Sequence, residues 1–525
     1  MSVESCVGRP YANSTLTTCL PQDVIDQTRA LFEAKLHTSP IITNGATQQE
    51  RSEFTDIESR VRDEFSRFSR YPASKILKKT TIFQLGLDSI NALQLASNLR
   101  EAGYNVTGSD ILQSPSVESL AQFLEQNYAH PIEQEAAFDF ATFNREYLDT
   151  ICLENSISEK SIEDIKPTTA VQQGILARYI QSDGQEYLNH IHLELESGVS
   201  QATLESAFEA VVEAHQILRT GFAHIKNSRF SFAMVSYQSF SFNIPFTALK
   251  EDDAKTWDVS TWRQNCSQEI QQRLHHPPWR VLFQPKNGRS SLHLLILHSL
   301  YDAHSLNLIF DDLASAIKGS VSRRPAFNPV LGAILNASAD SEAHKLFWKE
   351  QGAKFVFNRF PIMTPLRVSP RKIGTFAQAC SQSLLTFRRN CQKANVTMQA
   401  AGQAAWARLL ASYTGEQNVT FAIVLSGRTQ DGSDAMSFPC ITTVPFSCTI
   451  NTSNGKLLEQ AMKFNASVQN HQFTPISKIQ AWAGCPNTSL FDTLFAFQMP
   501  QNSRLSSRPW SIVEENSSAD VSSCN

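Results

Sequence analysis

Two histidines and an aspartate occur close together in the stretch "LILHSLYDAHSLNLIF", residues 295–310. His298 comes directly after a run of apolar residues, Asp302 follows four positions later, and His304 follows two positions after Asp302. An imidazole can serve as a general base near neutral pH, and histidine and aspartate are also common metal ligands. A core strand that merely contains histidines would show the same residues. The elements that must position these side chains help to separate the three readings.

The flanking pattern predicts a strand followed by a helix. Along residues 291–298, every second residue from Leu292 to His298 lies on one face, and most of these residues are apolar. The segment "SLNLIFDDLASAI" then has apolar residues at helical spacing, with Ser305 as the expected N-cap. His298 therefore ends a buried strand at the turn into a helix. A rigid strand can hold a catalytic group there while the turn leaves the group accessible.

A metal site at this turn would need His298, Asp302 and His304 to converge as ligands, which disfavours the metal reading. A general base and a histidine packed in the core both stay open. The sequence contains no G-x-S-x-G elbow, G-x-x-x-x-G-K-[ST] phosphate loop or G-x-G-x-x-G fingerprint that would supply another catalytic motif. A literal His-His pair at 275–276 is followed by prolines and has no aspartate in register. We therefore set that pair aside.

The segment "TTIFQLGLDSINALQLASNLREAGY" has the features of a helix whose N-terminus presents a serine. Gly86 permits a tight turn, Asp88 and Ser89 stand where the helix can begin, and apolar residues follow at helical spacing. The N–H groups of a helix N-terminus favour an attached phosphodiester by about 0.3–1 kcal/mol. From the residues alone, Ser89 is equally well explained as a simple helix cap.

Composition and charge exclude several classes of partner and compartment. The 525-residue chain has a net charge of −4, from 46 basic and 50 acidic residues without long runs of either sign, so it lacks the charge pattern that binds nucleic acid or anionic membranes. It has no signal-like N-terminus and no apolar stretch long enough to span a membrane. Ten cysteines without a C-x-x-C pair indicate reduced thiols rather than disulfides or a zinc site. We therefore expect a cytoplasmic protein.

Changes in composition and periodicity divide the chain into four parts. Residues 1–50 are interpreted as a linker or N-terminal extension with one short helical pattern, and helical periodicity dominates residues 51–130. Residues 131–160 are interpreted as a linker. Over 161–525, strand-like runs alternate with helical patterns, and the clearest strands are "YLNHIHLELES", "LHLLILHSL" and "NVTFAIVLSG". A helical domain followed by a larger α/β region is expected.

Residues 54–128 resemble a carrier (thiolation) domain of nonribosomal peptide synthetases. The match rests on the L-G-x-D-S-I motif around Ser89 and on "DILQSPSVESLAQFLE", which resembles the family's last helix and the loop before it. The resemblance implies a small all-α four-helix bundle. It also implies that Ser89 carries a covalent 4′-phosphopantetheine arm, with Asp88 as its neighbour in the motif.

The stretch "LHSLYDA" resembles the active-site motif H-H-x-x-x-D-G of condensation domains. The resemblance implies that His298 is the catalytic histidine and that Asp302 is a structural aspartate paired with an arginine. Leu297 and Ala303 depart from the motif, although the H-x-x-Y-D form resembles that of fungal synthetases for hydroxamate siderophores of the ferrichrome type. Other condensation motifs are resembled, in the expected order, by "IKPTTAVQQGILA", "VVEAHQILRTGF" with Arg219, "SGRT" with Arg428, "FPCITTVPF" and "SLFDTLFAFQ".

Together the resemblances imply a carrier domain followed by an α/β, two-lobed, chloramphenicol-acetyltransferase-like condensation domain. The resemblance covers about residues 162–498, and the polar tail after it leads us to expect a C-terminally truncated domain with an incomplete second lobe. Arg219 and Arg428 are both candidates for the partner of Asp302. His304 is interpreted as a polar residue at the start of a helix, and no metal site is expected.

The implied function is nonribosomal peptide synthesis, with siderophores as one product class. An acyl or peptidyl thioester on phosphopantetheine would be condensed with an acceptor amine, which His298 would hold or deprotonate. The expected partners are an adenylation domain or enzyme, further carrier domains and a phosphopantetheinyl transferase. Two alternatives stay open: a non-catalytic module that docks carriers within a larger synthetase, and a free-standing acyltransferase that takes a CoA donor.

Overall fold

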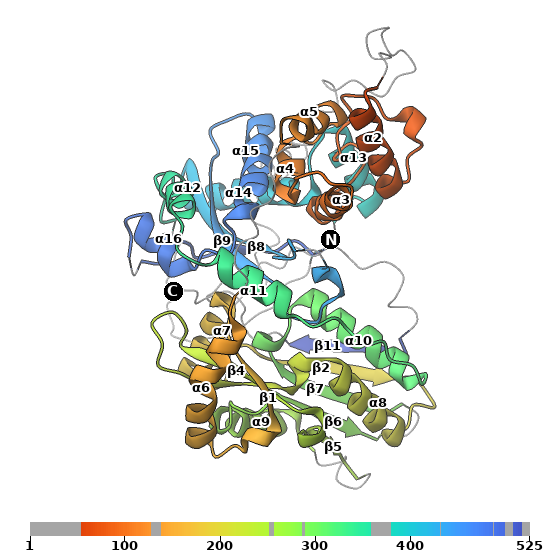
Figure 1. Cartoon of the computed structure of the whole chain (residues 1–525), viewed down its shortest axis with the longest axis vertical. Coiled ribbons are helices and arrows are strands. Elements are labelled where there is room, and N and C mark those ends of the chain that lie inside the picture. Colours follow the sequence, from red (N-terminus) through yellow and green to blue (C-terminus); the bar gives the residue numbers. More distant parts are fainter. Residues whose placement is uncertain are drawn as a thin grey trace.

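The computed structural model describes residues 54–127, 138–250, 257–285, 289–358, 378, 380–430, 432–486, 488–498 and 508–516. These residues form a helical bundle and two α/β lobes (Figure 1). In this view the bundle lies beside the second lobe at the top, and the first lobe lies at the bottom. The short helix expected within residues 1–50 lies outside the described residues.

The helical bundle packs four amphipathic helices around one apolar core, as the sequence predicts. These helices are α2 (Asp56–Ser69), α3 (Ser89–Glu101), α4 (Gly108–Gln113) and α5 (Val117–Asn127), with a 3₁₀ turn at Ala73–Lys75. Each helix buries side chains spaced three or four residues apart, because this spacing puts them on one face. The buried residues include Val61, Phe65, Leu95, Leu99, Ile111, Leu120 and Leu124.

The first lobe contains a five-stranded sheet in the order β11-β2-β7-β6-β5 and a three-stranded sheet in the order β1-β4-β3. The strands are β1 (Ile162–Pro167), β2 (Leu188–Leu195), β3 (Thr220–His224), β4 (Phe232–Tyr237), β5 (Phe246–Ala248), β6 (Trp279–Gln284), β7 (Ser291–Leu297) and β11 (Trp510–Asn516). Strand β7 pairs antiparallel with β2 and with β6, and all of its residues are buried. Elements therefore cover both faces of this central strand, as its nearly continuous apolar sequence indicates.

The helices of the first lobe pack on these sheets. They are α6 (Phe140–Asn155), α7 (Ala170–Gln181), α8 (Gln201–Ala214), α9 (Val259–Gln272), α10 (Ala303–Ile317) and α11 (Asn328–Ala337). Figure 1 shows α10 and α11 between the large sheet and the second lobe. The helix that follows His298 in sequence therefore lies on the side of the first lobe that faces the second.

The second lobe has a three-stranded sheet in the order β10-β8-β9. Its strands are β8 (Asn418–Leu425), β9 (Thr442–Thr449) and β10 (Leu494–Phe495). Its helices are α12 (Glu342–Gly352), α13 (Leu384–Lys393), α14 (Met398–Thr414), α15 (Asn454–Ser467) and α16 (Ile476–Trp482), with 3₁₀ turns η9 (Ser433–Ala435) and η10 (Val468–Asn470). The apolar cores of the two lobes are separate clusters. The two-lobed α/β architecture is thus the one expected.

One sequence interpretation is wrong in part. Within the expected linker over 131–160, residues 140–155 form helix α6, and Phe143, Tyr147 and Ile151 bury their side chains in the core of the first lobe. The spacing of four residues between these apolar positions gives the helix its buried stripe although the segment is polar overall.

The C-terminal tail, which is polar in sequence and lies beyond the motifs that carry the resemblance, contributes strand β11. This strand pairs antiparallel with β2, and the side chain of Trp510 is buried. Just before the strand, the Arg508 guanidinium donates to Asp311 on α10 at 2.8 Å. Residues 508–516 therefore complete one edge of the first lobe's larger sheet.

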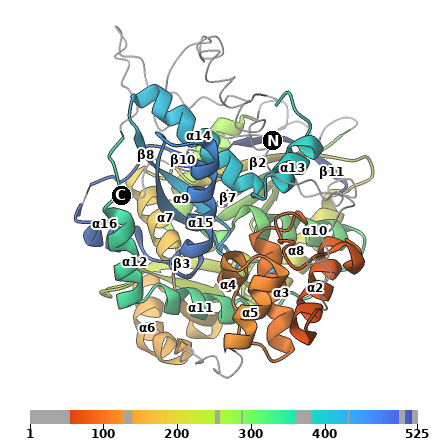
Figure 2. The same ribbon diagram turned by 90° about the horizontal axis from the view of Figure 1, so that it is seen from above.

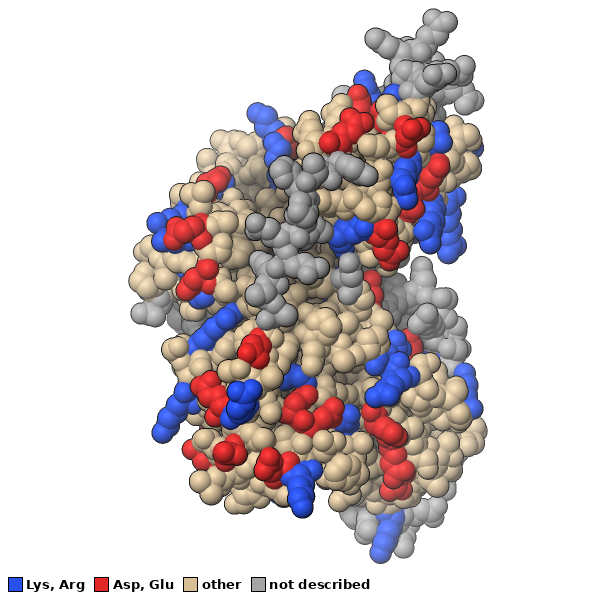
Figure 3. Space-filling view, in the orientation of Figure 1, with Lys and Arg blue, Asp and Glu red and all other residues tan. Residues whose placement is uncertain are grey.

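No helix in the described part of the chain is long and apolar enough to cross a membrane. On the face shown in Figure 3, basic and acidic side chains are interspersed. All cysteines within the described ranges are free thiols, and Cys266, Cys391, Cys440 and Cys448 are buried.

Candidate functional site

His298 lies at the C-terminal end of β7, the middle strand of the five-stranded sheet, where the sequence predicts it. The strand ends because residues 298–300 form a 3₁₀ turn, while the His298 backbone N–H donates to the Tyr187 oxygen at 2.9 Å. The His298 side chain is partly exposed. The reading as a histidine sealed within the core is therefore excluded.

The two ring nitrogens of His298 differ in what they can do. Nδ1 lies 2.9 Å from the backbone oxygen of Tyr301, and because a carbonyl oxygen only accepts, Nδ1 carries the proton of this bond. In the neutral imidazole, Nε2 then has the lone pair. The Tyr301 ring packs against the imidazole, with 4.7 Å between the ring centroids. An imidazole held in this tautomer can accept a proton at Nε2.

Two buried polar side chains brace the turn around His298. Gln172 on α7 donates from Nε2 to the Ser299 oxygen at 2.9 Å, and Asn189 on β2 donates from Nδ2 to the Tyr301 hydroxyl at 2.7 Å. Neither residue is predicted as a site residue from the sequence. The signal that points to them is a polar side chain on an otherwise apolar face, because buried polar groups nearly always have hydrogen-bond partners.

Asp302 pairs with Arg428 and not with Arg219. Arg428 Nη2 lies 2.8 and 3.0 Å from the two carboxylate oxygens, and the Cys440 backbone N–H donates to Oδ2 at 2.9 Å. Arg219 instead pairs with Glu163, with 2.7 Å between Nη1 and Oε2. Because Arg428 and Cys440 belong to the second lobe, the pair joins the two lobes directly beside the His298 turn.

Asp302 also starts helix α10. Its carboxylate accepts the Ser305 N–H at 2.7 Å, and the Ser305 hydroxyl lies 2.8 Å from the Asp302 nitrogen, which forms a capping box. The predicted N-cap at Ser305 is therefore wrong by three positions, because Asp302 takes the cap position and Ser305 becomes its N3 partner. Ala303 is the first helical residue and does not have a positive φ. Alanine can adopt this backbone as well as glycine.

The environment fixes the charge of Asp302. Burial alone raises its pKa, but the Arg428 charge and the N–H groups of Ser305 and Cys440 outweigh burial, so the pKa lies below its ordinary value. The carboxylate is thus ionised at neutral pH. It serves as a fixed charge between the lobes and not as a proton acceptor.

His304 also contacts the second lobe. Its Nε2 lies 2.8 Å from the backbone oxygen of Asp434 in η9. The sequence predicts His304 only as a polar residue at a helix start, and this contact between the lobes is an addition from the structure. The side chains of His298, Asp302 and His304 each bind a different partner, and within the described ranges no group of three or more ligating side chains could hold a metal ion.

Ser89 is the first residue of α3, as predicted. Gly86, with φ of 76°, makes the turn before it, and the side chains of Asp88 and Asn91 each accept the other's backbone N–H at 3.2 Å. The helix extends to Glu101, so its N-terminus has the partial positive charge that favours a phosphodiester. The start of α3 therefore fits a phosphopantetheine attached at this position.

The helical bundle docks on the second lobe. The Ser109 hydroxyl donates to the Ala466 oxygen at 3.1 Å, and the Thr81 hydroxyl hydrogen-bonds Asn395. Met462 on α15 packs against the cores of both the second lobe and the bundle. Figures 1 and 2 both place α4 side by side with α15. These contacts combine buried apolar surface with hydrogen bonds between segments more than 300 residues apart.

The turn before Ser89 lies at this interface. Arg388 on α13 donates from Nη2 to the Gly86 oxygen at 3.3 Å, and a Cβ at position 86 would lie only 2.2 Å from Gln392 Nε2. From α3 itself, Gln94 donates to the Asp434 carboxylate at 3.3 Å. The N-terminal half of α3 is thus held against the same lobe whose Arg428 pairs with Asp302 and whose Asp434 bonds His304.

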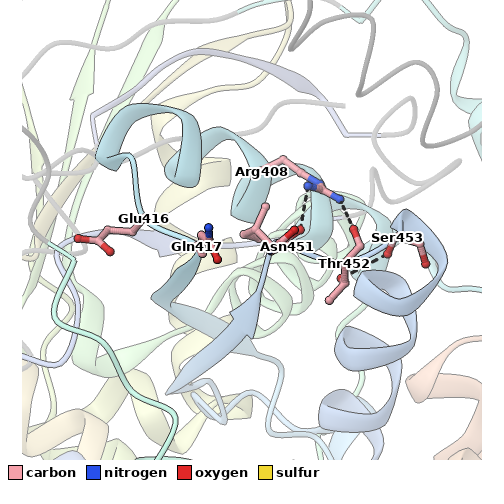
Figure 4. Close-up of a pocket in the computed structure, with 7 residues that line it drawn as sticks. Arg408, Glu416, Gln417, Asn451, Thr452 and Ser453 are labelled. Atoms are coloured by element: carbon pink, nitrogen blue, oxygen red, sulfur yellow. Dashed lines mark hydrogen bonds between the residues drawn. The ribbon is translucent and has the colours of Figure 1, made fainter.

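An open depression lies elsewhere on the second lobe (Figure 4). Arg408 at its rim donates to the backbone oxygens of Ile450 and Thr452 at 3.0 and 2.9 Å. The depression contains none of the predicted site residues. Arg408 thereby stabilises the loop that follows β9.

Two family models match the chain. A model described as Condensation domain matches residues 162–523, and one described as Phosphopantetheine attachment site matches residues 59–124. The first match covers more than half of the chain and includes β11. It therefore extends the condensation domain beyond residue 498, where the sequence resemblance had ended.

The curated relatives include large fungal synthetases. Nonribosomal peptide synthetase 2 of Cochliobolus heterostrophus is 36% identical over 472 residues, which are 90% of this chain and 9% of the relative. Nonribosomal peptide synthetase sidC of Arthroderma benhamiae is 36% identical over 467 residues, 88% of this chain and 9% of the relative. The hydroxamate-type ferrichrome siderophore peptide synthetase of Schizosaccharomyces pombe is 28% identical over 440 residues, 82% of this chain and 9% of the relative. The chain spans about a tenth of the length of these relatives.

Solved structures share the fold at low sequence identity. A structure described as "The crystal structure of CT" aligns with a TM-score of 0.50 at 16% identity, covering 74% of this chain and 86% of that one. A four-domain nonribosomal peptide synthetase bound to AMP and glycine aligns with a TM-score of 0.51 at 16% identity, covering 62% of this chain and 25% of that one. The matched segments coincide with the bundle and the two lobes. The chain therefore belongs to the condensation-domain family of nonribosomal peptide synthetases, and a carrier domain of the kind that bears covalent 4′-phosphopantetheine precedes its condensation domain.

Proposed function

We propose that the carrier domain presents an acyl or peptidyl thioester at Ser89 and that the condensation domain joins this group to an acceptor amine, with His298 as the base. The role of His298 as the base has one main observation in its support. Its Nδ1 is bonded to the Tyr301 oxygen while the side chain stays partly exposed, so Nε2 is oriented to take a proton. The Asp302–Arg428 pair holds the turn that bears His298 against the second lobe.

The reaction needs positioning more than strong chemical activation. An acceptor α-amine with a pKa of about 7.7–8.0 is only about a tenth neutral at pH 7. Its nitrogen forms a bond to the thioester carbonyl carbon, the C–S bond breaks, and the leaving sulfur takes a proton. His298 Nε2 accepts the proton lost by the attacking nitrogen and then passes it to the leaving sulfur, which returns the imidazole to its neutral form. Such a base contributes about 10²- to 10⁴-fold in rate, and positioning of the reactants lowers the barrier by about 7–11 kcal/mol.

When bound, 4′-phosphopantetheine supplies the thiol on which the acyl group is carried. The chain would hold it through the Ser89 hydroxyl and the N–H groups at the start of α3. Arg388 donates one N–H to Gly86, three residues before Ser89, and a guanidinium has further donors for a phosphodiester. The docked bundle therefore brings a cation of the condensation domain close to the attachment position.

The relatives support a substrate class and a set of partners. The similarity to a ferrichrome siderophore peptide synthetase leads us to propose that the amide formed belongs to a hydroxamate-siderophore peptide. Amino acids would be activated by an adenylation domain or enzyme and carried by further carrier domains. A phosphopantetheinyl transferase would convert Ser89 to the loaded form.

Replacement of His298 tests the base. In a reconstituted assay with donor-loaded chain and a carrier-bound acceptor, His298→Ala should lower the rate of amide formation by about 10²- to 10⁴-fold and leave phosphopantetheine loading unchanged. His224→Ala, at an exposed histidine on β3, is the matched control and should retain wild-type rates. Undiminished condensation by His298→Ala would remove the proposed base.

Loading tests the attachment site separately. Incubation of the chain with a phosphopantetheinyl transferase and coenzyme A should add one phosphopantetheine mass, and Ser89→Ala should abolish this gain in intact-mass spectrometry. A mass gain that persists in Ser89→Ala would place the arm on another residue.

A non-catalytic docking module is the second candidate. The departures at Leu297 and Ala303 suggested it, but Leu297 is a fully buried strand residue and Ala303 has an ordinary helical backbone. Neither departure disturbs the His298 turn. If the wild-type chain loads normally yet forms no amide with loaded acceptors, the docking module becomes the better description.

A further inference from the structure

One short loop of the second lobe contacts the carrier domain, helix α10 and Arg428, the partner of Asp302. We call residues 432–436 the η9 loop, since they contain the 3₁₀ turn Ser433–Ala435. The loop lies in the connection between β8, which ends at Leu425, and β9, which begins at Thr442. Its hydrogen-bond partners lie on carrier helix α3, on helix α10 of the first lobe, and at Arg428 of the second lobe.

Asp434 hydrogen-bonds both carrier helix α3 and helix α10. Its carboxylate accepts a hydrogen bond from Gln94 on carrier helix α3 at 3.3 Å. Its backbone oxygen accepts the Nε2–H of His304 on α10 at 2.8 Å. A single residue of the second lobe therefore joins the carrier helix that begins at Ser89 to the helix that Asp302 caps.

Arg428 connects the same loop to Asp302. Its Nη1 donates to the backbone oxygens of Ser433 at 2.5 Å and Met436 at 3.2 Å, while its Nη2 binds the Asp302 carboxylate. The arginine is buried, so these bonds do not compete with water. If the η9 loop shifts, it must either move Arg428 and His304 with it or break their hydrogen bonds to its backbone oxygens.

We propose that His304 is a positioning residue, which ties the η9 loop to α10 and thereby couples docking of the carrier at Asp434 to the arrangement of the His298 turn. The inference rests on the proposed function, because this coupling matters for chemistry only if His298 acts on cargo that the carrier presents. A polar residue with no role beyond a helix start would be solvated. His304 instead makes a short hydrogen bond to a backbone oxygen 130 residues away in the other lobe.

Amide hydrogen exchange in the full chain tests the coupling without needing any substrate. The Cys440 N–H donates to Asp302, so the peptide that contains it reports on the contact between the lobes beside His298. We would measure this peptide, and the peptide over 296–306, in His304→Ala, Gln94→Ala and the double variant. The matched controls are His224→Ala and Gln122→Ala, at exposed residues of the first lobe and of carrier helix α5.

The coupling predicts a specific pattern of exchange rates. His304→Ala should raise exchange in both peptides by about 3- to 10-fold, which corresponds to the loss of one hydrogen bond. Gln94→Ala, although it lies on the carrier, should raise exchange in the Cys440 peptide by about 2- to 3-fold. The double variant should not exceed His304→Ala. The conservative variant His304→Gln, which keeps an N–H donor, should restore most of the protection.

Other patterns would overturn the proposal. If Gln94→Ala leaves the Cys440 peptide unchanged while His304→Ala alters it, His304 is only a structural contact between the lobes. Fully additive effects, or equal increases in β5 at the far edge of the first lobe's larger sheet, would also contradict the coupling. If His304→Ala fails to fold, Gln94→Ala at an exposed carrier residue still decides the question. An inactive chain with the predicted exchange pattern would contradict the proposed function and leave the coupling in place.

Discussion

At the scale of single residues, the Asp302 carboxylate combines three structural tasks beside His298. It caps α10, accepts the Cys440 N–H and pairs with Arg428, so every one of its contacts fixes the turn between strand and helix. Loss of one partner leaves the other charge buried. This is why the interaction is costly to break although a buried ion pair adds little net stability compared with apolar residues of the same size.

The first prediction concerns this pair. Asp302→Asn should lower the free energy of unfolding by about 3–5 kcal/mol at pH 7, because Arg428 stays buried without its counter-charge. Urea denaturation monitored by tryptophan fluorescence measures the change. Glu350→Gln, which removes one partner of the exposed pair with Lys354, is the control and should have little effect.

The wild type and Asp302→Asn should differ in free energy of unfolding by an amount that depends on pH, because the pKa of Asp302 is lowered in the folded protein. The folded pKa lies below the unfolded value of about 3.9, so the stabilisation is present in full above that value and is lost as the pH falls through the folded pKa. The difference between the wild type and Asp302→Asn should therefore stay constant from pH 7 to about 5 and narrow below about 4. A difference that grows on acidification would contradict the assigned charge.

A second prediction concerns thiols. Burial raises the pKa of Cys391, Cys440 and Cys448 to about 12, so these thiols are protonated and unreactive at pH 8. Cys380 is exposed. Brief alkylation of the native chain at pH 8, followed by peptide mass spectrometry, should label Cys380 and spare the three buried thiols until a denaturant is added. Rapid native labelling of Cys440 would show that the contact between the lobes opens.

At the scale of elements, local sequence patterns predict the strand before His298 and the helix that begins at Ser89. The contacts between the lobes depend instead on residues far apart in the sequence. The strand before His298 and the helix that begins at Ser89 follow from apolar periodicity and cap residues within one segment. The choice of Arg428 over Arg219, and the contact of His304 with Asp434, depend on how two lobes meet. No spacing within one segment encodes such contacts.

A third prediction separates backbone strain from a close contact. Gly427 and Gly432 both have positive φ, of 64° and 74°. A Cβ at Gly427 would lie 1.7 Å from the Cys440 oxygen, whereas one at Gly432 would meet nothing closer than 3.9 Å. Gly432→Ala should therefore lower the free energy of unfolding by about 1–2 kcal/mol, and Gly427→Ala by clearly more, since it also displaces Arg428. Equal losses in urea denaturation would show that the close approach of Gly427 to Cys440 adds nothing to the backbone strain.

At the scale of the whole molecule, the carrier domain and the condensation domain form one docked unit in this structure. Hydrogen bonds connect α3, α4 and the turn before α3 to the η9 loop, α15 and α13, respectively. To be loaded by other enzymes, the start of α3 must also become accessible to them. Docking should therefore compete with loading.

A fourth prediction tests this competition by cross-linking. Thr81 and Asn395 hydrogen-bond across the interface, so Thr81→Cys with Asn395→Cys, in a Cys380→Ser background, should be joined efficiently by a short bis-maleimide. The cross-linked chain should accept phosphopantetheine more slowly than the same chain without reagent, as measured by intact mass. Gln122→Cys with Asn395→Cys is the control pair and should cross-link poorly. Unchanged loading after cross-linking would show that docking leaves the start of α3 accessible.

Strand β11 has a practical consequence for work with shortened forms of the chain. Because it covers β2, removal of residues 508–516 would leave the N–H and C=O groups of β2 as an open edge, together with an uncovered apolar patch at Phe310, which packs against Trp510. Open edges of this kind recruit strands from other molecules. Recombinant fragments that stop before Arg508 should therefore precipitate or form oligomers on concentration, whereas fragments that retain the segment should stay monodisperse in size-exclusion chromatography.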